Sequence, residues 1–289
     1  MTQNWLFLRT VSGAEIDYSA NVRTVPETKP MFTNNPFADI PAFITSSMMQ
    51  TYVIVMILLV TSGTIYDVLH KKSARYFWEN MKKSKAQATR DVGAGETVTL
   101  AIKTAVVDVA TSGEFCNPQR RIAHLLTMYG FIAFVGGTIM IAYSEPALSA
   151  PAIALQLWHI GALMICVGGY WFWFFIRVDV AAGGSSPFRV LPADTFILSL
   201  LASATFALIW SYLHSTGNAW DGVFFWLHVL STIFLFGTVP WSKFAHMFFK
   251  PAAAFEKRLS TANGSRSKLP APADAPPDFG SARQHSKHY

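Results

Sequence analysis

Two histidines near the end of the chain, His228 and His246, have the type and spacing that point most directly to chemistry. The eighteen residues from one to the other are mostly apolar. In an α-helix, eighteen residues make five turns of about 3.6 residues, so both imidazoles would project from one face. At about 1.5 Å per residue they would lie roughly 27 Å apart, close to the thickness of a bilayer's hydrocarbon core. One helix would therefore place a nitrogen ligand near each membrane surface, as two stacked haems require.

The composition indicates a membrane protein that carries these histidines on several spans. Of the 289 residues, 52% are hydrophobic and only 14% are charged, and the apolar residues gather in long runs. This profile is typical of a polytopic membrane protein. We predict an all-α bundle of five transmembrane helices, since each run is long enough to cross a bilayer. The predicted spans are residues 49–70, 121–143, 152–177, 192–214 and 222–249.

The distribution of positive charge predicts the orientation of the bundle. Twenty of the 23 lysines and arginines follow the first span, in the segments of one side, whereas the loops 144–151 and 215–221 contain none. By the positive-inside rule the N-terminus lies outside and the C-terminus inside, in the inner (cytoplasmic) membrane. The net charge of +6 therefore reports topology, and we expect no nucleic-acid partner. Residues 1–48 are an outer segment, 49–250 the membrane domain with an inner loop 71–121, and 251–289 a disordered inner tail.

Once the spans have a direction, four histidines sort into two pairs by depth. His124 and His246 fall near the inner surface, and His159 and His228 toward the outer one. Ionisable residues inside spans usually mark function, and haem b needs one neutral imidazole on each side of its iron. We therefore predict two haems, with iron ligated by His124, His246, His228 and His159. Interhelical hydrogen bonds or anchoring at the membrane interface are the alternative roles for these side chains.

Several other polar residues lie near the predicted membrane surfaces. His214, Glu145 and Asp221 fall at the outer ends of spans and are candidates for binding a quinone or moving its protons. Solvated loop and helix-cap positions are the alternative for all three. His70 is a spare candidate ligand for the inner haem, although an interfacial role is more typical of its position. Lys243 either pairs with a haem propionate or extends to the lipid headgroups.

Glycines on the second and third spans would let a flat cofactor approach the backbone. The alternative is ordinary packing of small residues between membrane helices. They are Gly130, Gly136, Gly137, Gly161, Gly168 and Gly169.

The inner loop and the cysteines bear on the partners of the chain. The loop opens with a basic and aromatic stretch over 71–85, which predicts a helix that lies on anionic lipid or docks a soluble partner. Cys116 and Cys166 have no CxxC spacing, so the thiols of this chain cannot by themselves form an iron–sulfur cluster. Any such centre must belong to a partner subunit.

These features resemble the respiratory nitrate reductase gamma-subunit family of dihaem b-type cytochromes. The resemblance covers about residues 50–250 and is most specific over Pro240-Trp241-Ser242-Lys243-Phe244-Ala245-His246. The stretch Arg120-Arg121-Ile122-Ala123-His124 before a glycine-rich span is similar to sulfur-pathway members of the broader group. Since no iron–sulfur domain is fused to this chain, it looks most similar to the free-standing membrane anchor associated with adenylylsulfate reductase and related quinone complexes of sulfur metabolism.

The resemblance implies His124 and His246 as inner haem ligands and His228 as an outer one. The nitrate reductase pattern takes the second outer ligand from ten residues beyond His124, where this chain has Phe134. His159 would have to substitute. The implied function is electron transfer between membrane quinone and a cytoplasmic iron–sulfur or flavin oxidoreductase such as adenylylsulfate reductase. A haem-poor structural anchor and a proton-coupled transporter are the alternatives, and the absence of internal repeats counts against the transporter.

Overall fold

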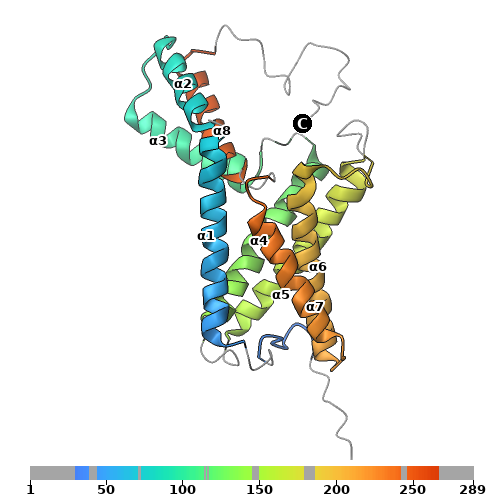
Figure 1. Cartoon of the computed structure of the whole chain (residues 1–289). Helices are drawn as coiled ribbons and strands as arrows, with labels where there is room; N and C mark the ends of the chain where they lie inside the picture. The colour runs from blue at the N-terminus through green and yellow to red at the C-terminus, as the bar shows by residue number, and fades with distance from the viewer. Residues whose placement is uncertain are drawn as a thin grey trace, which may run out of the picture.

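The chain folds into a bundle of helices, as seen in a computed structural model (Figure 1). The structure describes residues 30–38, 44–70, 73–113, 115, 117–144, 150–178, 186–241 and 246–266. Within these residues every regular element is helical, and four helices are long and apolar enough to cross a membrane. The predicted all-α multi-pass membrane architecture is therefore confirmed at this level. The side of the membrane on which each terminus lies stays a prediction.

The four long spans agree closely with the apolar runs of the sequence. Their bounds are α1 Ser46–His70, α4 Pro118–Ala142, α5 Ala152–Trp171 with a π-type extension η4 Phe172–Ile176, and α6 Thr195–Ser215. The start of α4 has a clear local cause. The Asn117 side chain accepts hydrogen bonds from the N–H groups of Gln119 and Arg120, and Pro118 occupies the first helical position.

The predicted fifth span is not one helix. Helix α7 runs from Asp221 to Gly237 and is followed by a turn over Thr238–Trp241, and a separate helix α8 begins at His246. With 17 residues, α7 is about 25 Å long, shorter than a full crossing of the hydrocarbon core. The prediction that His228 and His246 share one continuous helix is therefore wrong. Pro240 lies in the turn that follows α7. The helix therefore ends before this proline and does not continue as a kinked span.

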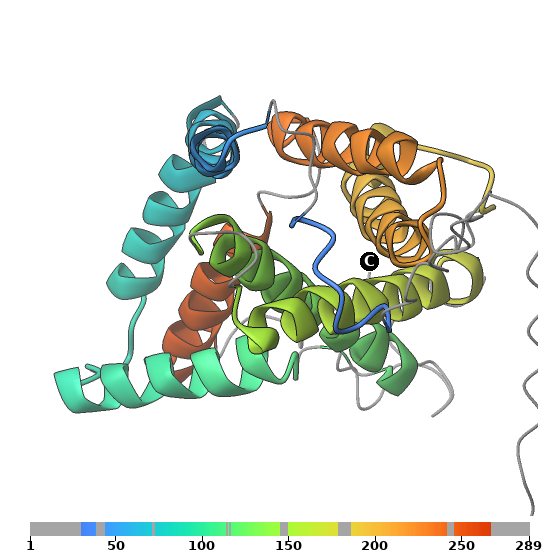
Figure 2. The ribbon, with the colours of Figure 1, turned by 90° about the horizontal axis from the view of Figure 1, so that it is seen from below.

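Helix α8 belongs to a group of helices at one end of the bundle, called here the cap end. The group comprises α2 Ser73–Ala86, α3 Ala94–Lys103, the π-type helix η2 Thr104–Ala110 and α8 His246–Ala262. Figures 1 and 2 place α2 and α3 on two sides of α8. The hydroxyl groups of Ser84 and Ser265 lie 2.8 Å apart, and Arg258 forms a bidentate ion pair with Asp108. Residues 251–262, expected in a disordered tail, are helical, whereas 267–289 lie outside the described residues.

The opposite end, where α6 ends and α7 begins, is called here the loop end. The N-terminal segment 30–38 lies there, and Phe37 packs edge-on against Trp158 and Trp210, with ring centroids 5.2 and 5.0 Å apart. From the sequence, residues 1–48 were predicted only as an outer segment. Their described part buries an aromatic ring in the core.

Glycines bring α4 and α5 into close contact. A methyl group built at Gly137 would lie 2.7 Å from the backbone nitrogen of Trp158, and one at Gly168 would lie 2.7 Å from the carbonyl oxygen of Ala123. Gly161 faces the backbone of Phe134 in the same way. These distances are shorter than real Cβ contacts, so only glycine allows this spacing. These glycines allow the two helices to pack closely. The backbone of the neighbouring helix occupies the space beside them that a cofactor would need.

The connection between α5 and α6 is fixed by a buried arginine at the cap end. The guanidinium of Arg177 donates to the carbonyl oxygens of Ser186 and Arg189 and to the carboxylate of Asp194, at 2.6 to 2.8 Å. It also lies 4.1 Å from the ring centroid of Trp173. Because the charge is paired and its donors are used, the arginine can be buried without a large penalty.

Candidate functional site

The fold separates the candidate histidines into two groups, one toward each end of the bundle. His159 on α5 and His228 on α7 both contact the ring of Trp158, in the half of the bundle near the loop end. His124 lies in the second turn of α4, and His246 is the first residue of α8, both at the cap end. The predicted sorting by depth thus agrees with the helix positions, although it does not show that any of these residues binds haem.

His228 is held in one orientation by the backbone of α6. Its side chain is nearly buried, with 8% of the residue exposed, and its Nδ1 lies 3.0 Å from the carbonyl oxygen of Ser203. A carbonyl can only accept, so Nδ1 carries the proton and Nε2 has the free lone pair. This is the tautomer that binds a metal through Nε2 while the other nitrogen is fixed by a hydrogen bond.

His159 has the same tautomer for the same reason. It is fully buried, and its Nδ1 donates to the carbonyl oxygen of Leu155 at 2.8 Å, one turn earlier on α5. Its Nε2 therefore accepts a hydrogen bond from the hydroxyl of Ser211 on α6, at 2.7 Å. The lone pair of His159 already has a donor, so ligation of a metal would require Ser211 to turn away.

Aromatic rings occupy the region between these two histidines. The indole of Trp158 has its ring centroid 4.9 Å from that of His159 and 6.3 Å from that of His228. Trp210 stacks on His228, and Phe134 meets it edge-on at 5.9 Å. In this arrangement the side chains do not fit a macrocycle between His159 and His228, since Trp158 would have to leave the centre. Phe134 fills core space in the same cluster, where it is 5% exposed.

One polar atom in this core lacks a partner within the described part of the chain. The indole nitrogen Nε1 of Trp158 is buried and makes no hydrogen bond there. An unmade hydrogen bond on a buried donor costs about 1 to 3 kcal/mol. Movement of the Trp158 ring would therefore break no side-chain hydrogen bond among the described residues.

The histidine at the cap end stands in a more polar setting. His124 is half-buried, its Nδ1 lies 3.0 Å from the hydroxyl of Ser112, and its ring packs against Phe115 at 4.9 Å. The ammonium of Lys250 on α8 lies 5.4 Å from the centroid of Phe115. Lys250 of α8 thus lies near the ring that packs against His124.

His70 is exposed at the end of α1. Its ring stacks on Tyr66 at 5.4 Å, nearly parallel. This placement suits an interfacial side chain better than a ligand of a buried cofactor.

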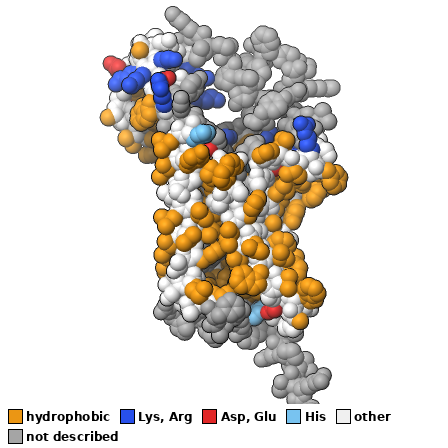
Figure 3. All heavy atoms as spheres, viewed as in Figure 1, with side chains coloured by type: hydrophobic (Ala, Val, Ile, Leu, Met, Phe, Trp, Pro, Cys, Tyr) orange, Lys and Arg blue, Asp and Glu red, His pale blue; other side chains and the backbone are white. Residues whose placement is uncertain are grey.

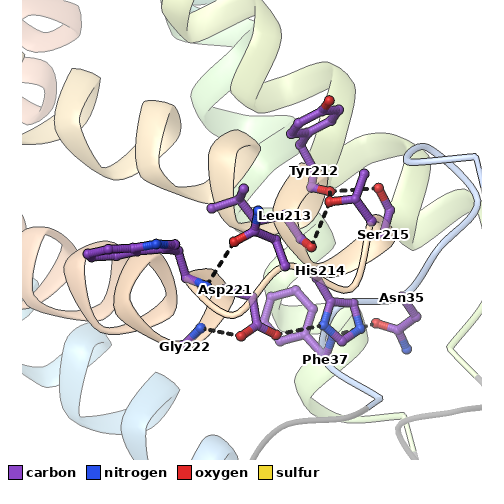
Figure 4. A network of polar contacts seen from close by, with 11 residues as sticks. Asn35, Phe37, Tyr212, Leu213, His214, Ser215, Asp221 and Gly222 are labelled. Atoms are coloured by element: carbon purple, nitrogen blue, oxygen red, sulfur yellow. Dashed lines mark hydrogen bonds and ion pairs between the residues drawn. The ribbon is translucent and has the colours of Figure 1, made fainter. Parts of the chain in front are cut away.

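The loop-end candidates form a polar cluster at the junction of α6 and α7 (Figure 4). Nδ1 of His214 lies 3.3 Å from a carboxylate oxygen of Asp221, with 13% and 40% of the two side chains exposed. Asn35, from the N-terminal segment, points toward the same imidazole, and Phe37 lies beside it (Figure 4). The structure therefore brings His214 and Asp221 together, as a proton-transfer role would need. Glu145 lies outside the described residues.

Other polar residues of the core were not anticipated from the sequence. Ser203 and Ser211 on α6 bind the two buried histidines, and they fall eight residues apart, on one helix face. That spacing within an apolar run was an available signal. Asp67 is 3% exposed, one turn after Gly63 on α1. A carboxylate within a predicted span was also a signal of a special position.

Two further observations concern metal binding and similarity to known proteins. The described residues contain no cluster of three or more His, Cys, Asp or Glu side chains that could hold a metal ion, which suits two-imidazole ligation no less than other roles. Comparison with protein-family models, with curated proteins and with solved structures finds no match. The fold and the site together define an all-helical, multi-pass membrane protein with buried, orientation-fixed histidines.

Proposed function

We propose that this chain is a b-type cytochrome membrane subunit that transfers electrons between membrane quinone and a soluble iron–sulfur or flavin oxidoreductase. In this proposal the soluble enzyme belongs to sulfur metabolism, such as adenylylsulfate reductase, and the cap end faces the cytoplasm. The observation that carries the proposal is the setting of His124 at the cap end, where the imidazole of a membrane-spanning helix is half-buried and its Nδ1 lies 3.0 Å from the hydroxyl of Ser112. Isolated imidazoles are costly within a membrane, so an orientation fixed in this way favours a ligand.

The cap-end pair supports the inner haem more strongly than the loop-end pair supports the outer one. Ser112 and Phe115 contact the half-buried imidazole of His124, and Lys250 of α8 lies against the ring of Phe115. When bound, haem b supplies a one-electron redox centre. The residues of the chain orient the imidazoles, exclude water and place the cofactor near the soluble partner.

The loop-end cluster is suited to the protons of quinone chemistry. His214 and Asp221 share one hydrogen bond at the end of the bundle and are partly exposed, so Nδ1 of His214 can exchange a proton with the carboxylate and with water. Because this cluster lies at the opposite end of the bundle from the cap end (Figure 1), the proposal has the quinone reaction and the soluble partner on opposite sides of the membrane.

The basic residues of α2 supply a surface for the soluble partner. Arg75, Lys82, Lys83 and Lys85 on α2, and Arg90 after it, are exposed. Figure 3 shows that lysine and arginine side chains gather at the upper left, where Figure 1 places α2. A surface of this charge favours an acidic partner and accelerates its association at low salt.

One alternative is favoured by a specific observation. The ring of Trp158 between His159 and His228 favours a subunit without the outer haem, which anchors the enzyme and holds at most the inner cofactor. Haem content separates the two proposals.

The test is a reduced-minus-oxidised visible spectrum of the purified protein, with haem measured per polypeptide. A b-type α band with two haems supports the full proposal, one haem supports the subunit with the inner site alone, and no band overturns the cytochrome proposal and leaves a haem-free anchor. His124→Ala and His246→Ala should remove the inner haem, and His228→Ala the outer one. His70→Ala is the matched control, since its exposed ring should leave the spectrum unchanged. An unchanged spectrum in His124→Ala and His246→Ala would overturn the ligand assignment.

A further inference from the structure

The segment formed by α3 and η2 has two sides of different character. On one side it packs against α8, through the nearly buried Thr104 and the ion pair of Asp108 with Arg258. The other side carries aliphatic side chains at helical spacing that remain exposed, with Ile102 60% exposed. This aliphatic stripe consists of Val98, Ile102, Val106 and Val109. Exposed apolar side chains aligned on one helix face mark a surface that something covers.

The segment lies across the bundle at the level where α4 begins. In Figure 2 the view runs along α1, which is seen end-on, while α3 is seen lengthwise. The end of η2 is tied to α4, because the hydroxyl of Tyr129 donates to the carbonyl oxygen of Ala110 at 2.7 Å. Arg121 donates to the carbonyl oxygen of Thr111, also at 2.7 Å. These bonds place the segment beside the first three turns of a membrane-spanning helix.

At that depth the neighbouring surfaces already face lipid. Ile122 and Tyr129 on α4 are exposed at the same level, and Leu69 is exposed at the corresponding end of α1. The aliphatic stripe therefore lies at the level of exposed apolar side chains on two spans. Figure 3 shows hydrophobic side chains below the basic ones on this part of the molecule. Lys103 is exposed at the end of α3, where its ammonium group can reach anionic headgroups.

We propose that the α3–η2 segment is a membrane-surface helix, which lies in the headgroup region of the bilayer with its aliphatic stripe turned into the lipid. The α3–η2 segment is linked both to His124 and to α8. Beyond η2, the hydroxyl of Ser112 binds Nδ1 of His124, and Asp108 holds α8, whose first residue is His246. The bilayer therefore supports the loop that orients His124. The membrane contact itself does not depend on whether the chain binds haem.

A nitroxide at position 102 tests this placement. Ile102→Cys is made in a full-length background with Cys116→Ala and Cys166→Ala, labelled, and reconstituted into bilayers of neutral lipid with and without phosphatidylglycerol. Collision rates with oxygen, which is enriched in lipid, and with a water-soluble nickel chelate are then measured. Lys85→Cys, on the basic surface of α2, is the matched control, and Val106→Cys gives a second position on the stripe.

The proposal expects positions 102 and 106 to collide several-fold more with oxygen relative to nickel than position 85 does. If phosphatidylglycerol raises this ratio at positions 102 and 106, the headgroup attraction is supported as well. Ready access of nickel to both stripe positions overturns the proposal, since it places the stripe in water. Low access of both reagents also overturns it, because the stripe is then covered by protein.

Discussion

The histidines at the two ends of the bundle lie in different surroundings. At the loop end, His159 and His228 are buried among aromatic rings, and backbone carbonyls fix their orientation. At the cap end, His124 is half-buried, and its surroundings come from separate pieces, the loop after η2 and the start of α8. A tightly packed core holds a ligand rigidly but resists a new cofactor. An assembled site is easier to enter and depends on the helices that complete it.

Forcing apart α4 and α5 should have the largest effect and should act on the loop-end half. In Gly161→Leu the new side chain meets the backbone of Phe134 and the carbonyl oxygen of Gly130, the latter at 2.7 Å from the first added atom. We expect a loss of about 4 kcal/mol in the free energy of unfolding, since backbone cannot yield as side chains do. Gly136→Leu is the control, because nothing lies within 4 Å there. The measurement is unfolding in mixed micelles followed by circular dichroism, and equal losses in the two variants would contradict the packing argument.

Removing one histidine at each end compares the two sites directly. His228→Ala leaves a cavity among aromatic rings and a carbonyl of Ser203 without its donor, so we expect a loss of about 3 kcal/mol. His124→Ala removes a half-buried ring with one hydrogen bond, so the loss should be about 1 kcal/mol. The same unfolding measurement on cofactor-free protein checks the difference. A larger loss for His124→Ala would reverse the comparison of the two ends.

Loosening α8 should have the smallest effect and should stay at the cap end. Arg258→Met removes the bidentate pair with Asp108, whose side chains are partly exposed, at a cost of about 1 kcal/mol. Amide hydrogen exchange in α8 should then rise about fivefold, while α5 and α7 are unchanged. Arg75→Met, which removes the exposed pair with Glu79, should leave exchange in α8 unaffected. Faster exchange in α7 after Arg258→Met would mean that the two ends are not independent.

The sequence predicts the four long spans well because length and continuous hydrophobicity determine them. The predicted run 121–143, for example, corresponds to α4 at Pro118–Ala142. The prediction of a fifth span is wrong because hydropathy does not distinguish a helix that bends at Pro240 from one that ends before it. The turn packs against α1, where Val239 and Pro240 contact Gly63, so a segment distant in the sequence helps to decide the outcome.

The sequence predicts the depth of the candidate histidines in the bundle, but it does not predict how each helix is rotated about its axis. Span direction places His159 and His228 at similar levels, and both contact Trp158. Which side chains face each other depends on how each helix turns about its axis, and that follows from packing such as Gly137 against Trp158. Of the cap-end helices, the sequence predicts α2 through the basic and aromatic stretch 71–85, but it does not predict α3 and η2. Aliphatic residues recur at helical spacing over 94–110, but this stretch lies between two predicted spans and was predicted only as part of a loop.

The glycine contacts between α4 and α5 also bear on the order in which the chain assembles. These helices are neighbours in the sequence and meet through their backbones, so they can form a stable hairpin soon after both enter the membrane. Helix α1 enters first but has to wait, because its contacts with α7 join residues such as Tyr52 and Val229, 177 positions apart. We therefore expect α1 to dock last and to be the span that is most easily detached when synthesis or insertion is disturbed.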